Sequence, residues 1–60
     1  MSAGTPANAH ILVVDDVPRN VRLLADVLGA HGYQTSTAAS GEEALACLAQ
    51  RKPDLVLLDV

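Results

Sequence analysis

An α/β fold built on a small parallel sheet is the fold class that this 60-residue sequence predicts. Two uninterrupted aliphatic runs, residues 11–14 and 55–58, have the composition of parallel strands that are covered on both faces. Two helical patterns alternate with these runs and with one further short strand, residues 33–38, which gives the order β-α-β-α-β. Parallel strands joined in this way are connected by right-handed crossovers.

Composition and charge narrow the class of protein. Half of the residues are hydrophobic, which argues against a disordered chain, and the net charge is -3, which disfavours nucleic acid and anionic membranes as partners. The single cysteine, Cys47, excludes an internal disulfide and is expected to pack on a helix. No apolar run approaches the roughly 20 residues of a membrane helix, and the first residues do not form a signal peptide. We therefore expect one small cytoplasmic domain.

The first half of the chain predicts a leader, a strand and a helix. Residues 1–9 are small and polar and are expected to be a disordered leader, so the domain itself is residues 10–60. The first strand is predicted at His10–Val14. Pro18 suits the first turn of a helix that ends near Ala30, with Gly32 as the residue that terminates it. An apolar stripe recurs along this helix at steps of three and four and is predicted to be core: Val17, Val21, Leu24, Leu28 and His31.

The second half predicts a polar strand, a capped helix and an aliphatic strand. Tyr33–Ala38 is the most polar of the three strands, as expected at a sheet edge. Ser40 and Glu43 form a capping-box pattern at the start of a helix, and the helix is predicted to end at residues 51–53, with cations in its last turn. The third strand is predicted at Leu55–Leu58.

Acidic residues follow both aliphatic runs. Asp15 and Asp16 come after the first run, and Asp59 comes after the second. Neighbouring parallel strands would bring these three carboxylates to the sheet edge outside which α/β proteins bind ligands. Their mutual repulsion makes a bare cluster costly, and a hard divalent cation that prefers oxygen ligands would relieve it.

Each of these residues also has an ordinary interpretation. Asp15 and Asp16 could simply cap the following helix and interact with its dipole. Asp54 suits a turn after Pro53. His31 is expected to meet free carbonyls at a helix end rather than to carry a phosphoryl group.

Three motifs together resemble the receiver domain of two-component response regulators. They occur in the order and spacing of that family: Ile11-Leu12-Val13-Val14-Asp15-Asp16, Ser40-Gly41-Glu42-Glu43-Ala44-Leu45 and Pro53-Asp54-Leu55-Val56-Leu57-Leu58-Asp59. The resemblance implies half of a flavodoxin-like doubly wound sheet with strand order 2-1-3. It also implies that Asp59 accepts a phosphoryl group from a histidine kinase or phosphotransfer protein, that Asp15, Asp16 and Asp59 hold Mg²⁺, and that the protein is not an enzyme in the usual sense.

The resemblance covers only the first half of a receiver. The hydroxyl and lysine residues that the family places after its fourth and fifth strands would lie beyond Val60, so we expect a truncated receiver with weak or absent Mg²⁺ binding and no working switch. A rival interpretation is a self-association module. The third strand, central in a complete receiver, would here be an exposed aliphatic edge that pairs with a second copy to form a homodimer or larger oligomer. An unrelated flavodoxin-like binding domain is a third option, but it explains neither the three acids nor the lack of a glycine-rich loop after the first strand.

Overall fold

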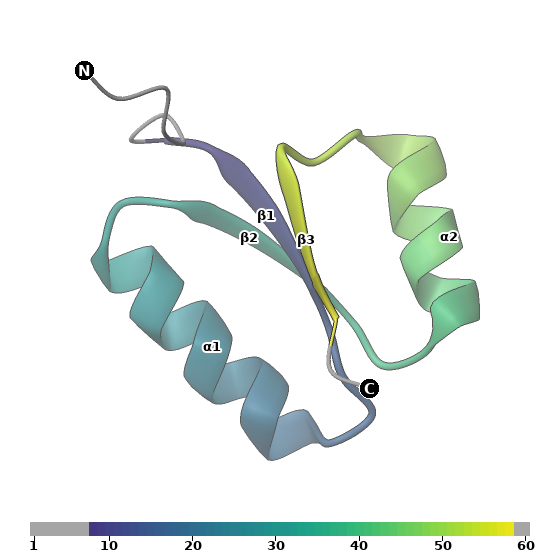
Figure 1. Cartoon of the computed structure of the whole chain (residues 1–60), viewed down its shortest axis with the longest axis horizontal. Helices are drawn as coiled ribbons and strands as arrows, with labels where there is room; N and C mark the ends of the chain where they lie inside the picture. Colours follow the sequence, from purple (N-terminus) through teal and green to yellow (C-terminus); the bar gives the residue numbers. More distant parts are fainter. Residues whose placement is uncertain (1–7, 59–60) are drawn as a thin grey trace.

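The fold is a three-stranded parallel sheet with one helix on each face (Figure 1). The computed structural model describes residues 8–58 of the chain. The elements follow one another in the predicted order: β1 (His10–Val14), α1 (Pro18–Ala30), β2 (Gln34–Ala38), α2 (Gly41–Gln50) and β3 (Leu55–Leu58). Ala9, predicted to end the leader, is buried, and its carbonyl accepts a hydrogen bond from the Gln34 N–H at 2.8 Å. Residues 1–7 lie outside the described residues.

The strand order β2-β1-β3 confirms the predicted topology. Both neighbours of β1 run parallel to it, and Val14 at its carboxyl end lies opposite Ala38 of β2 and Leu58 of β3. Because β1 is central, all five of its residues are buried, and Leu12 and Val13 are the largest fully enclosed side chains. The two predicted aliphatic strands are therefore neighbours that end side by side.

The core lies mainly between β1, β2 and α2. Leu12, Val14, Ala38 and Ala44 form one buried cluster, and Cys47 packs against it, which confirms the packing role expected of the cysteine. Side chains alternate along a strand, so Ile11 and Val13 point toward the opposite face, which α1 covers.

The helix ends follow local sequence signals. The Glu43 N–H donates to the Ser40 hydroxyl oxygen at 3.2 Å, which confirms Ser40 as the cap of α2. Gly32 has a φ of 90°, a left-handed conformation that suits a residue terminating α1. The His31 Nδ1–H donates to the Val27 carbonyl at 2.8 Å, as the ordinary interpretation of this histidine predicted.

Two predictions about the helices were wrong. The last turn of α2 holds no cation, because the helix ends before Arg51, whose guanidinium instead donates to the Gln34 side chain of β2. The apolar stripe of α1 contains no fully buried residue, and Leu24 is 37% exposed. The physical reason is that both helices pack over β1 and β2, whereas neither packs over β3. The flank of α1 that faces β3 therefore remains uncovered within the described chain.

Hydrogen bonds of His10 connect the three strands at the amino-terminal end of the sheet. His10 is only 5% exposed, and a 2.6 Å hydrogen bond joins its Nε2 to the Ser36 hydroxyl. Its backbone N–H donates to the Asp54 carboxylate at 2.8 Å, and the Asp54 N–H donates to the His10 carbonyl at 2.7 Å. Asp54 is thus more than the turn residue that was expected, because it ties the start of β3 to the start of β1.

Candidate functional site

The candidate site lies at the carboxyl ends of β1 and β3. Asp15 and Asp16 follow Val14 directly, and Val14 lies opposite Leu58, the last residue of β3. The two acids differ sharply in environment, since Asp15 is 3% exposed and Asp16 is exposed to solvent. Asp59, the predicted phosphoacceptor and third metal ligand, follows Leu58 in the sequence and lies outside the described residues. The structure therefore brings the acidic pair to the expected sheet edge and leaves the position of the third acid a prediction.

Asp15 is held in place from two directions. Its backbone N–H donates to the Ala38 carbonyl at 3.1 Å, which ties it to the end of β2. Its Oδ1 accepts the Val17 N–H at 2.9 Å, which ties it to the residue that precedes α1. The ordinary interpretation of Asp15 as a helix cap is not confirmed, because its Oδ1 binds the N–H of Val17, which precedes α1, and the start of α1 has no side-chain cap within residues 8–58.

We call Asp15 and Asp16, at the carboxyl end of β1, the acidic corner. The burial of Asp15 is its unusual feature. Removing a carboxylate from water is costly unless hydrogen bonds, a positive dipole or a metal ion compensate. The Val17 N–H supplies one hydrogen bond, and the amino end of α1 supplies the positive end of a helix dipole. This arrangement holds an acidic side chain in a fixed position at the edge of a sheet.

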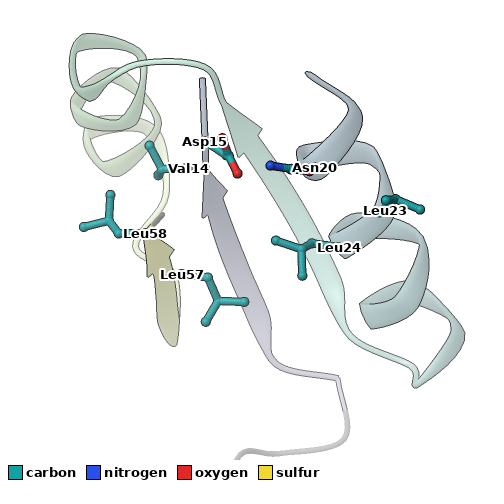
Figure 2. Close-up of a pocket in the computed structure, with 7 residues that line it drawn as sticks. All are labelled: Val14, Asp15, Asn20, Leu23, Leu24, Leu57 and Leu58. Carbon is teal, nitrogen blue, oxygen red and sulfur yellow. The ribbon is translucent and has the colours of Figure 1, made fainter. Parts of the chain in front are cut away.

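A groove of about 510 Å³ opens beside Asp15, between α1 and β3 (Figure 2). Leu23 and Leu24 of α1 and Leu57 of β3 line its aliphatic part. Its polar end contains Asp15 and Asn20, and Figure 2 shows the Asn20 side chain pointing from α1 toward the Asp15 carboxylate. The groove exists because neither helix packs over β3.

A second, smaller groove of about 330 Å³ borders Asp15 on the side of β2. Arg22 of α1, Thr37 of β2 and Glu43 of α2 contribute its polar groups. Asp15 therefore stands between two openings, one toward β3 and one toward the amino ends of both helices.

The donor set at this corner fits a hard divalent cation. Asp15 and Asp16 offer carboxylate oxygens, which Mg²⁺ prefers, and Mg²⁺ needs only one or two protein carboxylates because it retains several waters. Among residues 8–58 no group of three or more His, Cys, Asp and Glu side chains gathers as a metal site. A complete set of three acids would therefore require Asp59.

Sequence reasoning did not single out Asn20. The signal was present, because Asn20 lies one helical turn before Leu24, on a helix face that the apolar pattern assigned to the sheet. A polar side chain at the start of that face, five residues after Asp15, was in position to reach the carboxyl end of β1.

Comparison with known proteins identifies the family. The family model for the response regulator receiver domain matches residues 11–60 of the sequence. The chain belongs to this family. Response regulator PleD of Caulobacter vibrioides is 55% identical to it over 53 residues, and sensor histidine kinase RcsC of Escherichia coli is 58% identical over 50 residues. Protein PilH of Pseudomonas aeruginosa is 42% identical over 52 residues.

These matches cover most of the receiver chain but only part of each relative. They include 88% of the chain and 12% of PleD, 83% of the chain and 5% of RcsC, and 87% of the chain and 43% of PilH. No solved structure gives a significant match. Within residues 8–58, neither helix has the length and apolar character needed to cross a membrane.

Proposed function

We propose that this receiver accepts a phosphoryl group on Asp59 from the phosphohistidine of a histidine kinase or phosphotransfer protein, in the cytoplasm. The Asp59 carboxylate attacks phosphorus, the phosphorus–nitrogen bond of the phosphohistidine breaks, and the histidine leaves with the electron pair. The protein is then a signalling module rather than an enzyme that turns over a separate substrate.

The pairing of β1 with β3 is the observation that carries this proposal. Val14 lies opposite Leu58, so β1 and β3 end side by side, and in the sequence Asp15 follows Val14 and Asp59 follows Leu58. Membership of the receiver family and the name of the relative RcsC, a sensor histidine kinase, support the same function.

The acidic pair would hold Mg²⁺ together with Asp59. Asp15 is fixed by the Val17 N–H, and Asp16 is exposed beside it, where it can approach an ion without further desolvation. When bound, the ion would neutralise charge on the incoming phosphoryl group. The chain's own contribution is to fix one carboxylate rigidly and to keep a groove open on the β3 side.

Phosphorylation by a small donor tests the proposal. The chain, and the same chain continued by any further residues of its reading frame, would be incubated with acetyl phosphate and Mg²⁺ and mapped by mass spectrometry. We expect Asp59 to be labelled in the continued chain and labelled poorly in the 60-residue chain. Asp59→Asn should abolish labelling, whereas Asp26→Asn, the same change on an exposed position of α1, should leave it unchanged. Labelling that persists in Asp59→Asn would refute the assignment.

A second proposal, self-association, is favoured by the exposure of β3. This strand pairs only with β1 among the described strands, neither helix covers it, and Leu58 is 66% exposed. An aliphatic strand at a sheet edge is a template for pairing with another chain. We propose that two copies pair through β3 into a six-stranded sheet, which would cover part of this apolar surface.

Sedimentation velocity measures this association directly. The unmodified chain is expected to sediment as a dimer or larger species at micromolar concentration. Val56→Lys places a charge on β3 and should give monomers, whereas Thr35→Lys on the opposite edge strand, β2, should not. A folded, monomeric unmodified chain would rule out self-association without affecting the phosphoacceptor proposal.

A further inference from the structure

Asn20 occupies a position in the candidate site that no family motif assigned. It is the third residue of α1 and is partly buried. It lines the groove between α1 and β3, and its carboxamide points toward the Asp15 carboxylate (Figure 2). Leu23 and Leu24, which follow it in the same groove, are aliphatic, so Asn20 and Asp15 form the polar end together.

The usual local role for a polar side chain at this helix position is already filled. Such a side chain commonly reaches back to the backbone N–H of the residue that caps the helix. That residue is Val17, whose N–H already donates to Asp15 Oδ1 at 2.9 Å. Within residues 8–58 the Asn20 carboxamide makes no hydrogen bond of its own. Helix capping therefore does not account for an asparagine here.

A neutral carboxamide has chemistry that suits the neighbourhood of a hydrated cation. Mg²⁺ retains several waters, whose hydrogens must find acceptors, and a carboxamide oxygen accepts them without adding charge to an acidic corner. Groups in this outer position orient the metal-bound ligands, and their loss typically weakens metal binding by about 10- to 100-fold. The aliphatic wall of Leu23 and Leu24 limits the other polar partners available to such a water.

We propose that Asn20 is a positioning residue that accepts a hydrogen bond from a water of the Mg²⁺ ion held beside Asp15. This inference rests on the proposed function, because it presupposes that the acidic corner binds Mg²⁺. The proposal adds Asn20 to a binding site that otherwise consists of acidic residues. It also means that water molecules bound to the ion would occupy the polar end of the groove.

The test is a Mg²⁺ titration of the full 60-residue chain, followed through the backbone amide NMR signals of residues 15–17 at constant ionic strength. Asn20→Leu has a similar shape and lacks the acceptor, so its Kd for Mg²⁺ should rise by about tenfold. Asn20→Asp retains an acceptor and adds a negative charge, so it should bind at least as tightly as the unmodified chain. Asn8→Leu, the same substitution at an exposed position before β1, should leave the Kd unchanged.

Melting temperatures without Mg²⁺ separate positioning from a purely structural role. Asn20→Leu should melt close to the unmodified chain when no metal is present, and Asn20→Ala provides the same comparison if the leucine variant does not fold. An unchanged Kd in the folded variant would overturn the role of Asn20 and leave the metal site intact. If the unmodified chain gave no saturable shifts with Mg²⁺ in the tens of millimolar range, the metal site and the role of Asn20 would both be overturned in this chain.

Discussion

Replacing Asp15 by asparagine should separate its proposed role in metal binding from its observed role in holding Val17, the residue before α1. The carboxamide of the variant would keep an oxygen for the Val17 N–H, which Asp15 accepts at 2.9 Å, while the negative charge that favours a cation would be lost. Asparagine and aspartate serve almost equally well where a side chain accepts a backbone N–H near a helix start. The fold should therefore survive this change in the absence of metal, whereas Mg²⁺ should no longer stabilise it.

The magnitudes follow from the size of the chain and the contact. Unfolding entropy of about 2.1 cal/mol/K per residue gives about 126 cal/mol/K for 60 residues, so each kcal/mol shifts the melting temperature by about 8 °C. Asp15→Ala loses a hydrogen bond to a charged group, worth about 1.5 kcal/mol, and should melt about 12 °C lower. At a Mg²⁺ concentration about ten times its Kd, binding adds about 1.4 kcal/mol, which would raise the melting temperature of the unmodified chain by about 11 °C.

The assay is thermal unfolding followed by circular dichroism, with and without MgCl₂, at an ionic strength matched with NaCl so that general screening cancels. Asp15→Asn should melt near the unmodified chain without Mg²⁺ and show no rise with it. The control Asp26→Asn removes an exposed carboxylate of α1 and should keep the full rise. A Mg²⁺-dependent rise that survives in Asp15→Asn would show that the ion binds elsewhere, and the reasoning about this corner would be wrong.

Two further predictions concern stability, and both are measured by the same melts. Ser40→Ala removes the side chain that accepts the Glu43 N–H and should lower the free energy of unfolding by about 1 kcal/mol. Ser40→Asp should retain most of the stability. If the alanine variant melted at the same temperature as the unmodified chain, the cap would contribute nothing. Ser36→Ala leaves Nε2 of the buried His10 without its partner, in a ring whose Nδ1 has none among residues 8–58, and should cost about 1–3 kcal/mol. The double variant with His10→Leu should cost less than the sum of the two single changes, and strict additivity would show that the pair is not coupled.

The sequence by itself determined the elements and their order, because the signals that set them are local. Aliphatic runs, the Pro18 start, the Ser40 cap and Gly32 act within a few residues of their own position, and each lies in the structure where the pattern placed it. Placement of Asp15 at the carboxyl edge followed in the same way, since a residue after a parallel strand leaves the sheet at that edge.

Only the tertiary structure decided how deeply each residue is buried and which distant residues meet. Asp15 is enclosed and its neighbour Asp16 is not, because Asp15 is fixed to both Ala38 and Val17. His10 meets Ser36 because β2 lies beside β1 in one particular register, which no local pattern encodes. Leu23 and Leu24 of α1 remain exposed because the helices pack over β1 and β2, which leaves β3 uncovered and a groove beside it. Asn20 and Asp15, which lie on different elements, both line that groove. Such distances depend on how elements pack against one another, and packing is a property of the assembled sheet rather than of any one segment.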